Sequence, residues 1–339
     1  MSARERIIPV FIPHVGCPHN CVFCNQRKIS GQLTPAGTDT VIQAVEDAKK
    51  MLPEGSKPQL AFYGGSFTAI PSDEQISLLS AAHKYVETGF LDSIRLSTRP
   101  DAIDPETLER LHSFGVKTVE LGAQSLDREV LLRSGRGHTA EDVINAAALV
   151  KEYGFRLIIQ IMTGLPGDTP EKDIRTAEEV CRIAPYGVRI YPTVIIRDTA
   201  LYELWKAGKY EEHTVNDAVE ICSRIVPLFE NNGIEIIRLG LNPTDELSSG
   251  EAVGGAYHPA LGELVKSRIM YYRMRELIST ADVGRSIVIS GPARKLSQMT
   301  GQHRDNLKRL KKEFSLNSIR ISPSEDDELH IASELRIID

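Results

Sequence analysis

Three cysteines near the start of the chain are the residues whose type and spacing most clearly suggest chemistry. Cys17, Cys21 and Cys24 lie within eight residues, in the pattern C-x3-C-x2-C. Thiolates this close together on a loop can converge on one metal centre. Iron–sulfur clusters are usually held by four thiolates, so a set of three leaves one iron with a position open for a substrate or cofactor. The spacing therefore favours a catalytic iron–sulfur site.

Two other interpretations of these cysteines remain open. His19 lies between the first two cysteines, and three Cys with one His can bind zinc. However, His19 is two residues from each neighbouring cysteine, which leaves little slack for tetrahedral closure. A disulfide is less favoured, because the chain shows no signal peptide and no transmembrane run. These absences predict a reducing, cytoplasmic location.

The composition is that of an ordinary globular protein. The chain has 339 residues, of which 41% are hydrophobic and 25% are charged, and its formal net charge is −6. This length suits one large domain and a small one. The negative net charge argues against a chain-wide polyanion binder, so any nucleic-acid surface has to be local. Of the five cysteines, Cys181 and Cys222 lie in apolar helical patterns, where a buried structural cysteine is the ordinary explanation.

The elements that must position the cysteines alternate between apolar strands and amphipathic helices. Residues 7–14 predict a buried strand that leads into the cysteine loop. Further strands are expected at residues 60–63, 94–97, 118–122, 157–162 and 188–194. Such alternation predicts right-handed βαβ units and a parallel sheet. Six strands with intervening helices favour an α/β fold of the partial (β/α)6 TIM-barrel type.

In such barrels the chemistry lies at the carboxyl ends of the strands, and the polar and glycine-rich residues of this chain gather there. They are Gly64, Gly65, Ser66, Ser97, Gln124, Arg136 and Gln160. Structural alternatives exist: an ordinary turn for the glycines, backbone contacts for Ser97 and Gln124, and a solvated loop position for Arg136. Asp101 is expected to orient Arg99 or cap a turn, and His138 to have no catalytic part.

Taken in order, these motifs resemble those of the radical S-adenosylmethionine superfamily. Within it they resemble the branch of the Elongator catalytic subunit and the oxygen-independent coproporphyrinogen oxidase-like proteins. The resemblance covers roughly residues 7–240. The segments that carry it are the cysteine loop with Phe23, Tyr63–Phe67, Thr98–Asp101, Glu120–Ser125, Gly135–His138 and Gly164–Gly167.

The resemblance implies a cofactor arrangement and a reaction. Cys17, Cys21 and Cys24 would hold a 4Fe-4S cluster whose open iron binds S-adenosylmethionine. The contacts to S-adenosylmethionine would come from Phe23, Gly64, Gly65, Ser66, Ser97, Gln124, Arg136 and Gln160. One electron, from a flavodoxin- or ferredoxin-like donor, would cleave the sulfonium bond. The products would be methionine and a 5′-deoxyadenosyl radical that takes hydrogen from a substrate.

This sequence differs from the Elongator subunit in two features, and these limit the activity that the resemblance implies. The Elongator subunit has a long gap between its first two cluster cysteines, where this chain has three residues. That subunit also carries an acetyltransferase domain, whereas only about a hundred residues remain here after the barrel, so acetyl transfer is not implied. No second cysteine cluster is visible, which argues against sulfur insertion.

The end of the chain predicts a small α+β module. We expect a barrel at residues 1–240, a covering loop and helix at 241–283, and the module at 284–339. Its predicted order, strand–helix–turn–helix–strand, resembles the core of a KH domain, whose G-x-x-G loop clamps nucleotide backbone. Arg304 replaces the second glycine of that loop. The basic residues expected to contact RNA are Arg294, Lys295, Arg304, Lys308, Arg309, Lys311 and Lys312.

Three functions follow from these observations. The first is a radical S-adenosylmethionine enzyme that modifies RNA, with tRNA as the expected substrate. The second keeps the radical chemistry but acts on a small molecule or a protein. The third is a non-catalytic RNA-binding protein in which the cluster is structural.

Overall fold

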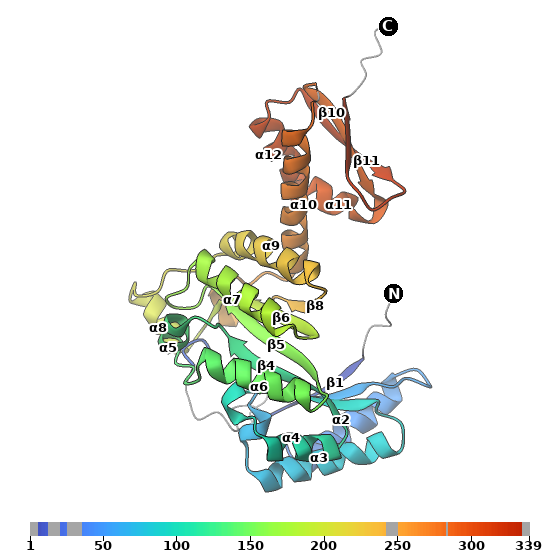
Figure 1. Cartoon of the computed structure of the whole chain (residues 1–339), viewed down its shortest axis with the longest axis vertical. Coiled ribbons are helices and arrows are strands. Elements are labelled where there is room, and N and C mark those ends of the chain that lie inside the picture. Colours follow the sequence, from blue (N-terminus) through green and yellow to red (C-terminus); the bar gives the residue numbers. More distant parts are fainter. Residues whose placement is uncertain (1–5, 13–20, 26–35, 242–249, 283, 334–339) are drawn as a thin grey trace. The chain divides into compact units, whose positions relative to one another are not determined.

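The computed structural model describes residues 6–12, 21–25, 36–241, 250–282 and 284–333. Its main sheet has seven parallel strands whose spatial order follows the chain. The strands are β1 Ile7–Phe11, β2 Gln59–Tyr63, β3 Ser93–Thr98, β4 Val116–Gln124, β5 Arg156–Thr163, β6 Gly187–Pro192 and β8 Glu235–Leu239. The sheet curls into a partial barrel (Figure 1). This confirms the predicted fold class.

Helices line the outer face of the sheet (Figure 1). They are α2 Thr38–Met51, α3 Ser72–Glu87, α4 Pro105–Ser113, α6 Ala140–Glu152 and α7 Pro170–Ile183. Side chains alternate between the two faces of a strand. Phe62, Leu96, Val119 and Ile159 are fully buried on the helix side. The opposite side, called the inner face below, carries Ser97, Gly122 and Gln160 on neighbouring strands.

The helix boundaries depend on local capping. Asp104 accepts a hydrogen bond from Thr107 N (2.7 Å) at the start of α4, and Thr139 and Asp142 form a reciprocal capping box on α6. The glycines that follow these two helices are left-handed: φ is 76° at Gly115 and 78° at Gly154. Helices α4 and α6 therefore stop where the chain must turn back into the next strand.

Two parts of the sheet differ from the sequence-based expectation. The strand expected at 188–194 is split, because Thr193 N bonds to Thr163 O (3.0 Å) and the chain then leaves the sheet. Its continuation, β7 (Val194–Ile196), pairs antiparallel with β9 (Ala252–Gly255). The seventh strand, β8, was not expected. It adds to β6 at the edge of the sheet.

The chain divides into two compact units: residues 1–214 with 228–257, and residues 215–227 with 258–339. In the second unit, α10 (Leu261–Thr280) packs against a three-stranded sheet and two helices. The other elements of this unit are β10 Ser286–Pro292, α11 Leu296–Thr300, α12 Asp305–Glu313, β11 Ser318–Ser324 and β12 His330–Ser333. The predicted order from strand to strand is confirmed, and β12 is an addition.

The core of the second unit contains side chains of α10. Met270, Tyr271 and Met274 are buried together with Ile287 and Leu310. The turn between α11 and α12 is fixed by Asn306, which is 3% exposed. Its amide donates to Gln298 O and Ser267 O, both at 2.9 Å. The buried side chain of Asn306 therefore stabilises the Gly301–Arg304 turn.

The remaining helices of the described chain are α5 Arg128–Arg133, α8 Ala200–Lys206 and α9 Val215–Asn231, with 3-10 turns at Phe67–Ala69, Pro100–Ala102, Ala293–Lys295 and Gln302–Arg304. Among the residues that the structure describes, no helix is both long and apolar enough to cross a membrane.

Candidate active site

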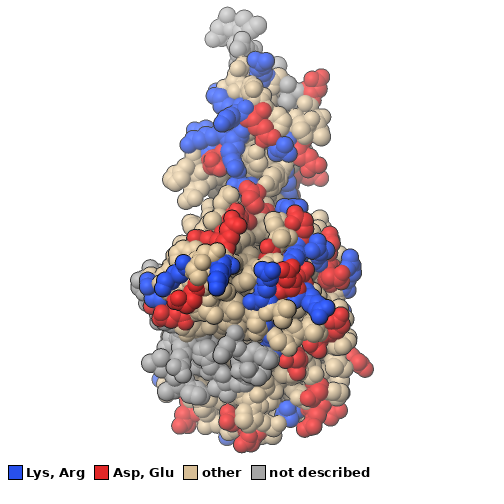
Figure 2. All heavy atoms as spheres, turned by 90° about the vertical axis from the view of Figure 1, so that its left-hand side faces the viewer, with Lys and Arg blue, Asp and Glu red and all other residues tan. Residues whose placement is uncertain are grey.

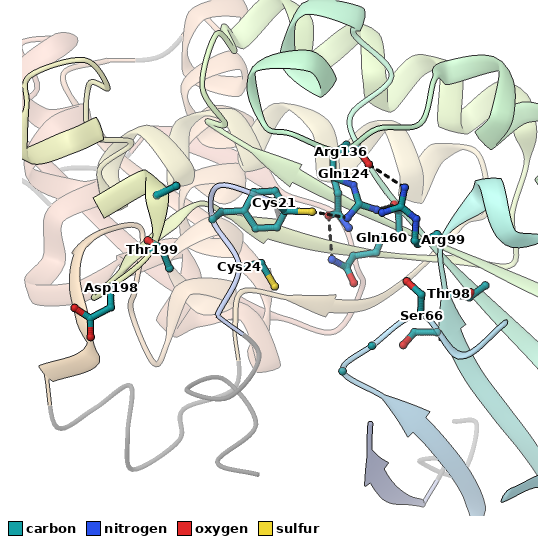
Figure 3. Close-up of a pocket in the computed structure, with 16 residues that line it drawn as sticks. Cys21, Cys24, Ser66, Thr98, Arg99, Gln124, Arg136, Gln160, Asp198 and Thr199 are labelled. Atoms are coloured by element: carbon teal, nitrogen blue, oxygen red, sulfur yellow. Dashed lines mark hydrogen bonds between the residues drawn. The ribbon is translucent and has the colours of Figure 1, made fainter. Parts of the chain in front are cut away.

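A pocket of about 260 Å³ lies at the carboxyl ends of the barrel strands. All eight residues expected to bind the cofactor line it: Phe23, Gly64, Gly65, Ser66, Ser97, Gln124, Arg136 and Gln160. Cys21 and Cys24 line it as well. Loops that lie far apart in the sequence therefore meet at one concave surface (Figure 3).

The cysteine segment is tied to the barrel by its backbone. Val22 N donates to Ser134 O (3.1 Å), and Leu201 N donates to Val22 O (2.7 Å). Cys24 N bonds to Cys21 O (3.0 Å), which closes a turn that places both thiols at the pocket. Cys17 and His19 lie outside the described residues. Within the described ranges, no three His, Cys, Asp or Glu side chains are grouped as metal ligands.

Phe23 lies between these two cysteines and joins the pocket to the apolar packing around it. Its ring packs against a buried cluster that contains Met162 and Leu165, with Tyr191 beside it. The pocket therefore has an apolar part beside Phe23, in addition to the amides and guanidinium groups that line it.

Arg136 connects the cysteine segment to strand β4. Its Nη1 donates to Cys21 Sγ (3.3 Å), and its Nη2 donates to Gly122 O (2.5 Å) (Figure 3). A Cβ at Gly122 would lie 3.4 Å from that Nη2 and 3.0 Å from Gln124 Nε2, so a small residue suits this approach. Arg136 is 7% exposed, and its buried Nε has no hydrogen-bond partner among the residues that the structure describes. The solvated position considered for Arg136 is therefore wrong.

Gln124 enters the pocket through a bulge in β4. The register shifts between Gly122 and Gln124, and Gln124 has a left-handed backbone with φ of 68°. Its Oε1 accepts a hydrogen bond from Gln160 Nε2 (3.0 Å). Left-handed backbone costs a residue with a side chain about 1 kcal/mol. The chain therefore accepts local strain to point this amide into the pocket.

Arg99 and Asp101 form the pair expected from the sequence. Arg99 donates twice to the Asp101 carboxylate, both at 2.8 Å, and once to Arg136 O (3.0 Å). Although burial favours the neutral acid, the hydrogen bonds from Arg99 hold the pKa of Asp101 below its usual value. The pair fixes the loop that carries Arg136. Arg99 is 2% exposed, and within the described ranges its buried Nη1 donates to no acceptor.

His138 is buried beside this loop, and it is not among the residues that line the pocket. Its Nε2 lies 3.1 Å from Ala123 O. Burial, with Arg136 nearby, lowers the pKa of His138 to about 4. The imidazole is therefore neutral at physiological pH, and it supports the end of β4.

Six pocket residues were not among the predicted contacts: Thr98, Arg99, Gly122, Asp198, Thr199 and Ala200. Thr98, Arg99 and Gly122 lie in motifs that the sequence had marked. Asp198, Thr199 and Ala200 follow β7, and Thr199 caps α8 by accepting from Tyr202 N (3.1 Å). Their position depends on the β7–β9 pairing, for which the sequence carries no turn signal.

The second unit carries the predicted basic residues on α12 and on the 3-10 turns Ala293–Lys295 and Gln302–Arg304. Figure 2 shows Lys and Arg side chains gathered on one face of this unit. Arg294 pairs with Asp327 (2.7 Å), and Arg309 lies 3.7 Å from Asp305. In the part of the chain that the structure describes, the other five form no ion pair: Lys295, Arg304, Lys308, Lys311 and Lys312. Four of these five are exposed, and Lys295 is half-buried.

Comparison with known proteins identifies the class. Residues 11–180 match the family model of the radical SAM superfamily, and residues 185–271 match that of the Radical_SAM C-terminal domain. The chain therefore belongs to the radical SAM superfamily, whose enzymes use a 4Fe-4S cluster and S-adenosylmethionine.

Relatives within this superfamily include tRNA-modifying enzymes. The chain is 30% identical to human Elongator complex protein 3 over 204 residues, which are 54% of this chain and 37% of that protein. It is 29% identical to the tRNA uridine(34) acetyltransferase of Methanocaldococcus jannaschii over 257 residues, which are 64% of this chain and 48% of that protein. The chain spans less than half the length of these relatives.

The fold has a solved counterpart. The Elp3 structure from the archaeon Methanocaldococcus infernus matches with a TM-score of 0.62 at 24% sequence identity. The match covers 83% of this chain and 65% of that one.

The residues present fit the cofactors of the superfamily. Two of the three predicted cluster ligands lie at the pocket, next to paired glutamine amides and a guanidinium that reaches Cys21. Arg136 Nε, a buried donor that bonds to no acceptor in the described part of the chain, is suited to an acceptor group from outside the protein.

Proposed function

We propose that Cys17, Cys21 and Cys24 hold a 4Fe-4S cluster and that the pocket beside them binds S-adenosylmethionine. The cluster supplies the electron that cleaves the sulfonium bond reductively. The meeting of eight predicted contact residues and two of these cysteines in one pocket is the observation that carries this proposal.

In this proposal each group has a physical task. The guanidinium of Arg136 stabilises the Cys21 thiolate by a charge-assisted hydrogen bond. Gln124 and Gln160 hold each other's amides in place, which leaves the Gln160 oxygen and the Gln124 Nε2 group to select polar groups of the ligand. Gly64, with φ of 99°, lets backbone approach the ligand where a Cβ would intrude.

The test is cleavage of S-adenosylmethionine by the full chain. After anaerobic reconstitution with iron and sulfide and addition of dithionite, the wild type should form 5′-deoxyadenosine, and Cys21→Ala should lose both the cluster absorbance and this product. Cys181→Ser is the matched control, because Cys181 contacts Leu228 O away from the pocket. A wild-type protein that binds a cluster but forms no 5′-deoxyadenosine would support the non-catalytic, structural role instead.

We further propose that the substrate is RNA, with tRNA as the first candidate, and that the enzyme acts in the cytoplasm. Support comes from the names of the relatives and from the basic surface of the second unit. Within this proposal the barrel of residues 1–240 makes the radical and the module of residues 284–339 contacts RNA phosphates, with residues 241–283 between them. A flavodoxin- or ferredoxin-like protein supplies the electron.

The RNA proposal predicts a charge-dependent affinity. Arg304→Glu with Lys308→Glu should weaken anaerobic tRNA binding, and the slope of log K against log salt should fall by about 0.7–0.9 for each phosphate that the variant no longer neutralises. Lys57→Glu with Lys84→Glu changes the net charge equally on exposed residues of the first unit and is the control. Equal affinity of the two double variants would exclude this surface as the RNA-binding site.

A further inference from the structure

A polar cluster crosses the interior of the partial barrel, and its residues are not among those that line the pocket described above. Its centre is Arg189 on β6, which donates to Glu120 on β4 (2.8 Å). Arg189 also donates to Tyr191 OH (3.2 Å) and to Tyr63 OH on β2 (2.9 Å). Strands β2 and β6 have three strands between them in the sheet. The curvature of the sheet is what brings these side chains together.

The cluster lies directly beside the cofactor pocket. Arg189 is in register with Gln160, and Glu120 is in register with Ser97, so all four lie on the inner face. Ser97 and Gln160 both line the pocket. Neighbouring parallel strands are about 4.8 Å apart, so a ligand seated on this cluster would adjoin whatever fills the pocket.

The cluster offers hydrogen-bond donors in excess. Burial raises the pKa of Tyr63 to about 12 and also raises that of Tyr191, so both phenols keep their protons. Each phenol oxygen accepts a hydrogen bond from Arg189, which leaves its O–H to donate elsewhere. Within the described residues, neither O–H donates to a protein acceptor. Arg189 therefore fixes the positions of two phenols, and each phenol has an O–H group that can donate to a ligand.

The charge of the cluster is positive. Burial opposes the charge of Arg189, but the carboxylate of Glu120 raises the pKa of that guanidinium, so it stays protonated. Arg238 on β8 lies on the same inner face, in register with Arg189. Among the described residues of this cluster, Glu120 is the one anion against these two cations. Such a site favours an oxyanion.

Access to this site selects a small ligand. The side chains of Arg189 and Glu120 are only 12% and 5% exposed. A polymer backbone cannot reach groups buried in this way, whereas a carboxylate at the end of a small molecule can. A carboxylate has two acceptor oxygens, so it can accept one hydrogen bond from each of the two phenol O–H groups.

We propose that Tyr63, Tyr191 and Arg189 bind the carboxylate of a small-molecule substrate. A C–H bond of this substrate gives up its hydrogen atom to the 5′-deoxyadenosyl radical made in the adjoining pocket, which leaves 5′-deoxyadenosine and a substrate radical. The proposal rests on the proposed cleavage of S-adenosylmethionine for its role, but not for its binding chemistry. An RNA-modifying enzyme of this kind would take a small acid as a second substrate beside the nucleotide.

The test measures anion binding without catalysis. Acetate is titrated into the cluster-loaded full chain without reductant, and binding is followed by saturation-transfer difference NMR. Wild type should bind acetate, and Tyr63→Phe with Tyr191→Phe should weaken it about tenfold or more, because hydrogen bonds to charged groups are removed. Tyr85→Phe with Tyr272→Phe is the matched control, since those hydroxyls bond to the surface residues Glu46 and Glu220.

The outcomes separate the alternatives. Inorganic phosphate, followed by phosphorus NMR line width, is the second probe. Phosphate binding that disappears in the double variant would support the oxyanion site and assign it a phosphate instead. Binding of neither probe to wild type, or equal binding by wild type and the double variant, would overturn the proposal. Because no cleavage is needed, failure here is distinct from failure of the 5′-deoxyadenosine assay.

Discussion

His138 should make the folded protein sensitive to acid. Its ordinary pKa of 6.5 falls to about 4 in the fold, first because of burial and then because of Arg136. As the pH falls below 6.5, the unfolded chain takes up a proton that the folded chain refuses. At about 1.4 kcal/mol per pKa unit, the free energy of unfolding should drop by about 3 kcal/mol between pH 6.5 and pH 4.

The variant that isolates this effect is His138→Gln, whose amide can still donate to Ala123 O but does not titrate. Urea unfolding followed by circular dichroism at pH 7.5, 5.5 and 4.5 gives the free energy of both proteins. Other groups titrate equally in the two, so the difference reports His138 alone. As the pH falls, the free energy of unfolding of the variant should rise relative to that of the wild type. At pH 4.5 the difference should reach most of the expected 3 kcal/mol. Parallel curves would refute the reasoning.

Two further predictions concern buried polar groups. Burial, with the adjacent Asp168, raises the pKa of Asp173 well above its ordinary value, so its favourable contribution is present in acid and is lost as the pH rises through the raised pKa. Asp173→Asn, which imitates the protonated acid, should therefore be more stable than wild type at pH 8 in urea unfolding, and lower stability would contradict this. Asn306→Ala removes the amide that bonds to Gln298 O and Ser267 O, and it should lower the unfolding free energy of the second unit by about 1–3 kcal/mol. A change below about 0.5 kcal/mol would show that the turn is held by other interactions.

Much of the barrel could be predicted because its signals are local. Helix starts at Asp104 and Thr139 depend on side chains within three residues, and the left-handed glycines mark the ends. The carboxyl-end rule then brought the pocket residues together without knowledge of the tertiary structure. The end of β6 was less predictable, because it depends on the bond from Thr193 N to a different strand.

The polar cluster around Arg189 is a part of the barrel interior that could not be predicted from the sequence. Tyr63 and Glu120 each begin a segment that carries the family resemblance, whereas Arg189 lies outside these segments, and no spacing in the sequence relates the three. They meet only because the sheet curls, so that residues of β2 and β4 both reach one guanidinium on β6. The register of neighbouring strands and the curvature of the whole sheet are long-range properties that local patterns do not encode.

The bulge in β4 has a consequence for engineering this protein. Gly at position 124 would relieve the left-handed backbone of Gln124, and a selection for thermal stability alone would accept that change. The same change would remove the amide that accepts from Gln160. Selection for thermal stability alone should therefore enrich variants that fold well but bind the ligand poorly. Any attempt to stabilise this strand has to include a screen for ligand binding.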